Sequence, residues 1–348
     1  MFLNFLKTFS VLLCASFCLH SVAQSPTQAP DPLIDRTLNV AEVNSLDGSG
    51  MKPWHLKLEV EFVDGHGNVS DHGTVEETWA SATEHRVVYT RGAKTMIELQ
   101  NGDGLYRSKG PDPSLGLLAS VLEQVVHPIP SQSDLTKVTL TSETLPFGKL
   151  KFDCVMAGQS FRDLASTPLG LYPTYCLDHT QGSMLRANFD IGGRVVLRNA
   201  IASFQGKMVT TNLSVNEDEK EIARAKVVAL QAAALTEADF KPTDELSKIE
   251  SAPVMVEQKV IAKNKLGGPN PIYPVSAKEK RHEGSVVMDV IIGWDGRVRE
   301  LEVTKYPSGD LAVSAVTAAS RWFYSPYLVN GEPVDCKTTI TINYRFGN

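Results

Sequence analysis

The sequence predicts a mainly β protein with two globular domains, an antiparallel β domain followed by a small α+β domain. Three observations predict this. Apolar and polar residues alternate with a period of two through much of the chain up to about residue 211. Asn-Gly, Asp-Gly and Gly-Gly pairs separate several of these runs, as they do in β-hairpins. The 348 residues, 42% hydrophobic and 21% charged, have the length and composition of two globular domains.

Residues 1–23 have the pattern of a secretory signal peptide. Lys7 precedes an apolar run from Phe9 to Leu19, and Ser21 and Ala23 supply small residues before a cut at Gln24. The run is shorter than the roughly 20 residues that a membrane-spanning helix needs. We therefore expect export to the periplasm with cleavage. The alternative is an inner-membrane anchor formed by an uncleaved N-terminus.

Export bears on the cysteines. The expected cleavage leaves Cys154, Cys176 and Cys336 in the exported chain. An oxidising compartment favours pairing, and Cys154 and Cys176 lie close together in strand-like segments, so we expect a disulfide between them. Cys336 would stay unpaired. The alternative is that all three are buried thiols.

Alternation is clearest at His55–Phe62, where every second residue from Leu56 is apolar. Further strands are expected at Thr74–Trp79, Arg86–Thr90, Thr95–Gln100, Lys137–Thr141, Lys149–Met156, Met184–Asp190, Arg194–Ala200 and Lys207–Leu213. One apolar helix, capped by Ser114 and stopped by Pro128, is expected to cover the sheet. The charged stretch Glu217–Arg224 suggests a second helix, and Ala225–Leu230 a last strand.

Composition sets the domain boundaries. Residues 24–48 begin with the low-complexity run QSPTQAPDP and are expected to form a flexible lead. The antiparallel β domain then covers residues 49–235. Residues 236–253 are polar and contain proline, which predicts a linker. The α+β domain covers residues 254–348.

The segment PWHLKLEVEF and the long run of strands ending in DFKP resemble the periplasmic lipoprotein carrier LolA and its relatives. The resemblance implies a half-barrel with one covering helix and a cavity able to hold a lipid or acyl chain. The alternative is a packed sheet without a ligand.

The stretch Gly284–Val303, GSVVMDVIIGWDGRVRELEV, predicts a hairpin close to the end of the chain. Its first arm places four apolar side chains on one face, those of Val286, Met288, Val290 and Ile292. Asp295 and Gly296 make the turn. The apolar phase then slips between Val298 and Leu301, which predicts a β-bulge near Arg299–Glu300.

A helix with an apolar stripe from Leu311 to Trp322 follows the hairpin, with Ser308 or Asp310 as its cap. After the turn at Asn330-Gly331, the segment PVDCKTTITINYRF alternates without a break. The alternation places Cys336 on the buried face of this last strand, which supports leaving it unpaired.

The Tyr-Pro pair, the hairpin, the helix ending in RWFYSP, the NGEPV turn and the last strand together resemble the C-terminal domain of TonB over about residues 252–346. The resemblance implies a three-stranded antiparallel sheet with helices on one face. It also implies binding to an outer-membrane TonB-dependent receptor or a similar envelope protein. By resemblance, the partner-binding residues are Tyr273, Pro274, Thr338, Thr339, Ile340, Thr341, Ile342, Asn343, Tyr344 and Arg345.

Independently of the family, a last strand at a sheet edge can accept an extended peptide by strand addition. Such an edge also permits a strand-exchanged homodimer.

Ile272 stands where the family has a polar residue, which puts the contact role of the Tyr273-Pro274 segment in doubt. The alternative for this pair is a rigid entry into the following helix.

Other classes of function have little support. The net charge is −6, and the slight basic excess lies only in residues 251–348, so nucleic acid is not an expected partner. His66 and His72 have no third metal ligand beside them, no serine lies in a nucleophile context, and no catalytic residues, metal or cofactor are expected.

The sequence thus predicts a non-enzymatic periplasmic adaptor of the TonB family for transport across the envelope. The alternative is a lipid or lipoprotein carrier that uses its TonB-like domain for docking. An apolar cavity in residues 50–230 would favour the carrier, and an open edge strand beside a solid first domain would favour the adaptor.

Overall fold

A computed structural model describes residues 31–250 and 252–346 of the chain. The expected signal peptide and residues 24–30 of the expected lead lie outside the described residues. The residues from Pro32 onward form one compact unit that contains both predicted domains. In the described part of the chain, no helix combines the length and the apolar character needed to cross a membrane.

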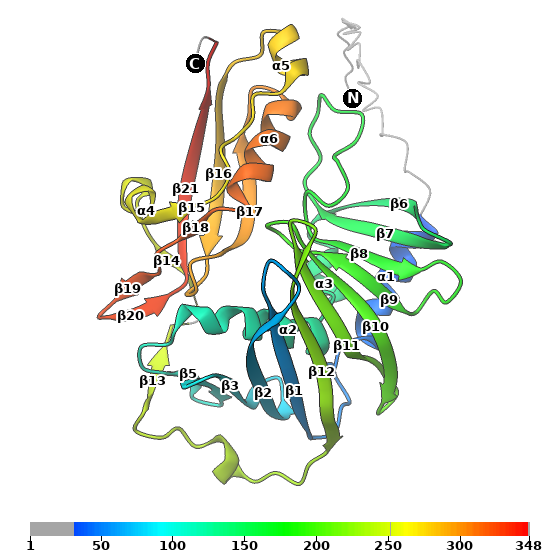
Figure 1. Cartoon of the computed structure of the whole chain (residues 1–348), viewed down its shortest axis with the longest axis vertical. Helices are drawn as coiled ribbons and strands as arrows, with labels where there is room; N and C mark the ends of the chain where they lie inside the picture. Colours follow the sequence, from blue (N-terminus) through cyan, green and yellow to red (C-terminus); the bar gives the residue numbers. More distant parts are fainter. Residues whose placement is uncertain (1–30, 251, 347–348) are drawn as a thin grey trace, which may run out of the picture. The chain divides into compact units, whose positions relative to one another are not determined.

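Thirteen strands within the described residues form one antiparallel sheet in the first domain (Figure 1). They are β1 (Trp54–Val63), β2 (Val69–Ser81), β3 (Glu84–Arg91), β4 (Lys94–Asn101), β5 (Gly104–Ser108), β6 (Thr139–Phe147), β7 (Leu150–Gly158), β8 (Thr174–Asp178), β9 (Leu185–Phe189), β10 (Arg194–Phe204), β11 (Lys207–Glu217), β12 (Lys220–Ala232) and β13 (Leu246–Ile249). Their order in the sheet is β13-β5-β4-β3-β2-β1-β12-β11-β10-β9-β8-β7-β6. The sheet therefore ends at β13 on one side and at β6 on the other.

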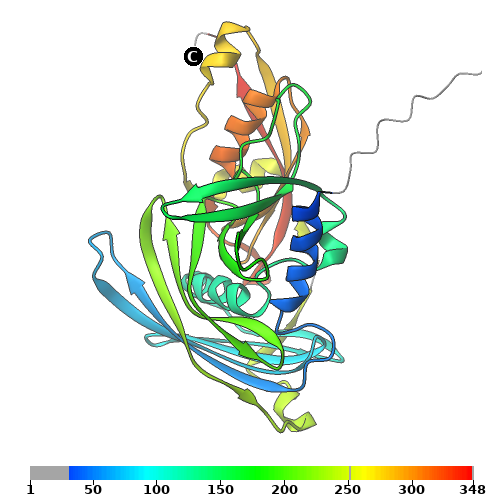
Figure 2. The same cartoon turned by 90° about the vertical axis from the view of Figure 1, so that its right-hand side faces the viewer.

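The sheet curves around helix α2 (Gly116–Val126), as Figures 1 and 2 both show. Leu118, Val121 and Val125 of α2 are buried in one cluster with the inward residues of β1, such as Leu56 and Leu58. The expected alternation in β1 and the expected covering helix are both confirmed. The expected cap is wrong, since Ser114 lies inside the preceding 3-10 turn and Leu115 is the N-cap residue of α2. Residues 113–115 form a short 3-10 helix, η1, in front of α2, and Gln132–Leu135 form α3 behind it.

The expected helix at Glu217–Arg224 is wrong, because these residues form the end of β11, a two-residue turn and the start of β12. Asp218 and Glu219 adopt positive φ values of 51° and 63°, as a tight hairpin turn requires. The strand is favoured over a helix because Ala223 and Ala225 enter the core of the sheet beside β1.

The expected lead and linker also differ from the structure. Helix α1 (Pro32–Val43) lies within the expected flexible lead, and it buries Val40 and Ala41 against residues of β8 and β9. Within the expected linker, η2 (Glu237–Phe240) buries Phe240, and β13 pairs with β5. The linker therefore contributes an edge strand to the first sheet. Both segments looked loop-like because each buries only a few side chains, which leaves no long periodic pattern.

The second domain contains the three antiparallel strands expected from the sequence, β16 (Gly284–Ile292), β17 (Val298–Lys305) and β21 (Cys336–Tyr344). A fourth strand, β14 (Val254–Met255), pairs in parallel with the start of β21 and extends the prediction. The sheet order is β14-β21-β16-β17. The remaining elements are α4 (Gln258–Asn264), β15 (Lys265–Gly267), α5 (Val275–Glu279), α6 (Gly309–Ala319), β18 (Phe323–Tyr324), β19 (Tyr327–Val329) and β20 (Glu332–Val334).

The predicted bulge is confirmed. Ile291 pairs with Glu300 and Ile292 pairs with Val298, so Arg299 is the extra residue in the ladder. The bulge returns Val298 and Leu301 to the same face, where both are buried under α6.

The turn of the β16–β17 hairpin joins the two domains. Trp294 is 5% exposed, and it packs in the core cluster of the first domain rather than in that of its own domain. Arg107 of β5 lies over its ring, 4.9 Å from the centroid. Gly116, the first residue of α2, lies so close to Asp295 that a side chain there would collide with it.

A second contact between the domains comes from the segment 159–173, which follows β7. The Gln159 amide donates to the backbone oxygen of Val303 and accepts from its N–H, at 3.1 and 2.6 Å. The Asp163 carboxylate accepts from the N–H of Gly309, the first residue of α6, at 2.8 Å. Phe161 and Tyr172 are buried in the core of the second domain.

We expect Trp294→Ala to destabilise both domains together, because it empties a large buried site at their junction. The expected loss in the free energy of unfolding is about 3–5 kcal/mol. Urea unfolding would measure it, with Ile272→Ala, at a side chain that is 78% exposed, as the control. Equal midpoints for the Trp294→Ala variant and the unchanged protein would contradict this role.

Candidate functional site

The predicted partner-binding strand, β21, has one fully paired edge and one largely open edge. Along its length it pairs with β16, from Cys336 opposite Ile292 to Tyr344 opposite Gly284. On its other side the described residues supply only the two-residue β14, opposite Cys336 and Lys337. From Thr338 onward, no strand of the described chain occupies this edge.

The hydrogen bonds to β14 show which backbone groups point outward. The carbonyl oxygens of Asp335 and Lys337 accept from residues 254 and 256, so the odd-numbered residues face β14. Backbone groups alternate in direction along a strand. Thr339, Thr341 and Asn343 therefore direct their N–H and C=O groups to the open edge. The even-numbered residues direct theirs to β16.

Side chains of β21 fix the strand on both faces of the sheet. The side chains of Thr338, Ile340, Ile342 and Tyr344 are buried on the face that α6 covers. On the opposite face, Thr339 donates to Asp289 at 3.0 Å, and Ser285 donates to Asn343 at 2.6 Å. Arg345 follows the last paired residue. The strand is thus held in place while its outer backbone stays accessible.

Helix α4 borders the open edge. It follows β14 directly, buries Ile261 in the domain core, and leaves most of its other residues exposed. Thr341 donates to the side-chain oxygen of Gln258, the first residue of α4, at 3.4 Å. An added strand would therefore run beside this helix.

The structure brings Tyr273 to the end of the predicted strand. Its ring lies edge-on to that of Tyr344, with centroids 5.5 Å apart, and 5.6 Å from the ring of Phe346. Its hydroxyl donates to the backbone oxygen of His282 at 2.5 Å. Pro274 is the N-cap residue of α5, as the alternative of a rigid helix entry expects. Ile272 is exposed on the same segment.

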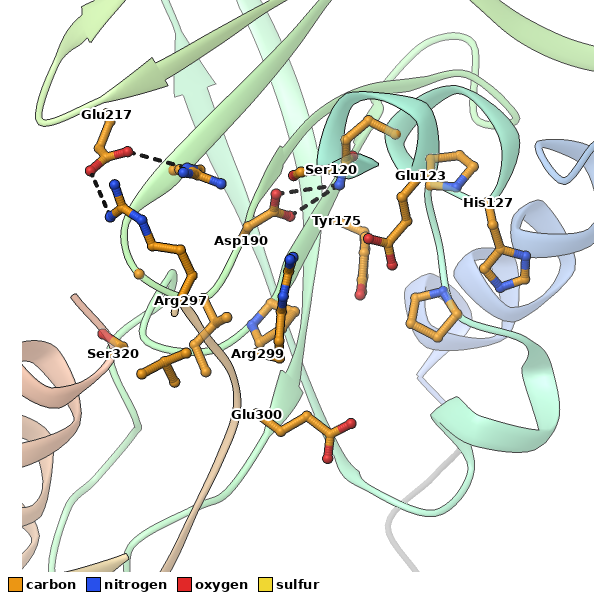
Figure 3. A pocket seen from close by; sticks show the side chains of 18 of the residues that line it. Ser120, Glu123, His127, Tyr175, Asp190, Glu217, Arg297, Arg299, Glu300 and Ser320 are labelled. Atoms are coloured by element: carbon orange, nitrogen blue, oxygen red, sulfur yellow. Dashed lines mark hydrogen bonds and ion pairs between the residues drawn. The ribbon is translucent and has the colours of Figure 1, made fainter. Parts of the chain in front are cut away.

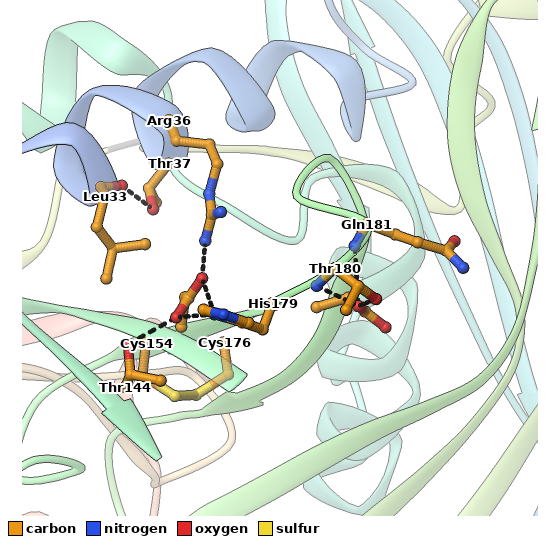
Figure 4. A network of polar contacts seen from close by, with 11 residues as sticks. Leu33, Arg36, Thr37, Thr144, Cys154, Cys176, His179, Thr180 and Gln181 are labelled. Carbon is orange, nitrogen blue, oxygen red and sulfur yellow. Dashed lines mark hydrogen bonds and ion pairs between the residues drawn. A yellow bond between two sulfur atoms is a disulfide. The ribbon is translucent and has the colours of Figure 1, made fainter. Parts of the chain in front are cut away.

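The predicted disulfide between Cys154 and Cys176 is present, and Cys336 is free and buried. The bridge joins neighbouring strands β7 and β8. Beside it, Arg36 of α1, Thr144 and His179 all contact the carboxylate of Asp153 (Figure 4). Burial alone would raise the pKa of Asp153, but these hydrogen bonds hold it at about 2. The network ties α1 to the end of the sheet.

A cleft of about 410 Å³ lies between α2 and the bulged strand β17 (Figure 3). Asp190 on its wall accepts from Asn188 at 2.6 Å and from Gln124 at 3.3 Å, and the buried Arg198 donates to both of these amides. Burial raises the pKa of Asp190 to about 6. The sequence predicted none of these residues as functional, because polar residues scattered over three elements give no motif.

Four arginines of the described chain line this cleft, and each has a carboxylate partner. Arg321 reaches Asp218 at 2.9 Å. Arg194 and Arg297 both reach Glu217, and Arg299 reaches Asp295, with separations of 3.2, 3.5 and 2.9 Å. The charges of the cleft are thus largely satisfied within the protein. We interpret it as part of the junction between the domains.

A buried polar cluster lies on the concave face of the large sheet. Glu77 Oε2, Trp79 Nε1 and His85 Nδ1 have no hydrogen-bond partner among the described residues. Trp79 stacks on Trp54, with centroids 5.6 Å apart, so both tryptophans belong to the packed core. Burial raises the pKa of Glu77 to about 8, and the nearby carboxylates of Asp47 and Glu98 add to the shift. The carboxyl of Glu77 therefore carries a proton at neutral pH.

Comparison with known proteins agrees with the resemblance of the second domain. Residues 269–346 match the family model of the Gram-negative bacterial TonB protein C-terminal. The match covers α5, β16, β17, α6 and β21, but not β14 and α4, which lie beside the open edge. A comparison with curated protein sequences finds no match to this chain.

Solved structures similar to this chain include the LolA type expected from the sequence. A LolA superfamily protein from Nitrosomonas europaea is 10% identical with a TM-score of 0.38, covering 60% of this chain and 97% of its own. A putative outer membrane lipoprotein-sorting protein domain from Vibrio parahaemolyticus is 10% identical with a TM-score of 0.37, with the same coverage. A DUF1329 family protein from Desulfovibrio piger is 8% identical with a TM-score of 0.34, covering 60% and 95%.

Glu77→Gln tests the buried carboxyl on the concave face. Its folded-state pKa of about 8 lies above the ordinary 4.5, so the folded protein binds a proton that the unfolded chain releases. The free energy of unfolding should then fall as pH rises from about 4.5 to about 8. The glutamine keeps the shape without the charge, and above that range it should gain roughly 3–5 kcal/mol over glutamate.

Urea unfolding across this pH range measures the effect. Glu76→Gln is the matched control, since Glu76 faces solvent and pairs with Lys57. A pH profile of Glu77→Gln that keeps the slope of the unchanged protein would contradict the assignment.

Proposed function

We propose that this protein is a periplasmic envelope adaptor of the TonB type, with a binding rather than a catalytic role. Its second domain would bind an extended segment of an outer-membrane TonB-dependent receptor, or of a similar envelope protein, by strand addition along β21. The observation that carries the proposal is the outward-facing backbone of Thr339, Thr341 and Asn343 in a domain that matches the TonB C-terminal model.

The opposite side of the same sheet supports this choice of edge. The outer edge of β17 is contacted by Gln159, which satisfies both backbone groups of Val303. The other edge, beyond Lys337, pairs with no strand of the described residues, and α4 lies beside it. A partner strand thus meets less competition at β21 than at β17.

The proposal does not extend to carriage of lipid inside the first domain. The concave face of the large sheet, where an acyl chain would lie, is packed with side chains of α2 such as Leu118, Val121 and Leu122. A cavity of about 370 Å³ remains between α2 and the sheet, but Glu77, His85 and Glu98 line it beside the apolar residues. It is therefore not the apolar cavity that would favour a carrier, and the open edge of β21 favours the adaptor.

Thr341→Pro tests the edge directly. It removes an outward N–H and leaves the hydrogen bonds to β16 intact, so the domain should fold. Loss of a main-chain hydrogen bond and the clash of the ring should reduce partner capture about tenfold. The measurement is a pulldown from solubilised envelope with residues 24–348 as bait, with the amount of captured outer-membrane receptor quantified by mass spectrometry.

Thr341→Ala is the matched control, because it keeps the N–H and should capture as much receptor as the unchanged bait. Ile342→Pro is a second comparison, since its N–H points to β16 and its loss should lower the unfolding temperature. Equal capture by the Thr341→Pro and Thr341→Ala baits would overturn strand addition at this edge. A homodimer that disappears in Thr341→Pro would show that a second copy uses it instead.

A further inference from the structure

The β6–β7 hairpin ends in an exposed apolar turn. Phe147 pairs with Leu150 across the two residues Gly148 and Lys149, and Gly148 has a φ of +60°. Both apolar side chains of this last pair are 55% exposed. Figure 1 shows the hairpin at the end of the large sheet.

The exposed pair continues an apolar strip that begins in the core. Phe147 stacks on Phe152, with ring centroids 5.1 Å apart and 18° between the planes. Phe152 is buried in the same cluster as the disulfide of Cys154 and Cys176. The turn therefore holds Phe147 and Leu150 at the exposed end of a packed apolar strip.

The charge around this turn is positive. Lys149 and Lys151 are exposed, and neither forms an ion pair with a carboxylate of the described residues. The neighbouring carboxylates are already satisfied, Asp153 by Arg36 and Asp178 by Arg186. Glu143, the exposed acid of β6, lies further back, opposite Cys154.

The β19–β20 hairpin does not combine exposed apolar side chains with unpaired lysines. It also exposes a leucine, Leu328 of β19, at 55%. It carries Glu332, however, whose carboxylate accepts from the N–H of Gly110 at 2.6 Å and so ties that hairpin to the first domain. It serves as a matched comparison, since it has similar apolar exposure without free lysines.

We propose that the β6–β7 turn inserts Phe147 and Leu150 into a lipid surface whose anionic headgroups attract Lys149 and Lys151. Aromatic and aliphatic side chains flanked by lysines bind at the boundary of headgroups and acyl chains, where the apolar parts leave water and the ammonium groups stay hydrated. Each lysine near an anionic surface adds attraction that salt weakens. The hairpin would hold the adaptor at a membrane independently of the partner strand at β21.

Vesicle flotation with residues 24–348 tests the proposal. The probes are vesicles of phosphatidylethanolamine with phosphatidylglycerol, and vesicles of phosphatidylcholine alone. The unchanged chain should float with the anionic vesicles at low salt, and less with phosphatidylcholine. Phe147→Ser with Leu150→Ser should weaken binding about tenfold or more, because the apolar contact is lost. Lys149→Gln with Lys151→Gln should weaken it about fivefold per lysine, on anionic vesicles only.

Leu328→Ser is the control and should float like the unchanged chain. Circular dichroism melting of each variant checks that it folds, and little change is expected since the replaced side chains are exposed. Thr341→Pro should also float normally, which separates this proposal from strand addition at β21.

The proposal is overturned if the unchanged chain does not float, or if Leu328→Ser loses as much binding as the double serine variant. Self-association that the double serine variant abolishes, without flotation, would assign the turn to a second copy.

Discussion

Burial of Trp294 determines how the two domains are joined. A tryptophan next to a turn would ordinarily face water, but here the first domain surrounds it with the apolar residues that line α2 and the concave sheet. The hairpin of β16 and β17 is therefore fixed at its turn by one domain and along its strands by the other. Because β21 pairs with β16 along its length, the burial of Trp294 helps to fix the position of the open edge, together with the contacts of Gln159 and Asp163.

Contacts at the same junction between the domains also determine which edge of the small sheet is covered and which stays open. Gln159 mimics a strand by pairing with both backbone groups of Val303, and Asp163 accepts from the first N–H of α6, where a negative charge also complements the helix dipole. These contacts come from a segment without regular strands, yet they close one side of the small sheet. The other side keeps only the short β14. The asymmetry leaves one edge of the small sheet open to strand addition.

Much of this arrangement was predictable because it follows from local periodicity. The strands of the hairpin, the bulge at Arg299 and the disulfide all leave a pattern within about twenty residues. The outward direction of Thr339 and Thr341 was not predictable, since it depends on which side β14 occupies. The place of Trp294 was likewise hidden, because Arg107, which lies over its ring, and the residues of α2 come from a distant part of the sequence. A bulky aromatic residue at a turn was the only local signal for it.

The short connection between the sheets has a mechanical consequence. Ile249 ends the last strand of the large sheet and Val254 begins the first strand of the small one, so the intervening chain spans at most about 18 Å. If the junction at Trp294 opened, the second domain could swing but not leave. A force on the second domain that separated β14 from β21 would then act on β13. That strand pairs with β5 through only four residue pairs. A force along this connection therefore acts on both edge strands, β13 and β14. The strand with the weaker pairing determines the force at which the connection begins to extend.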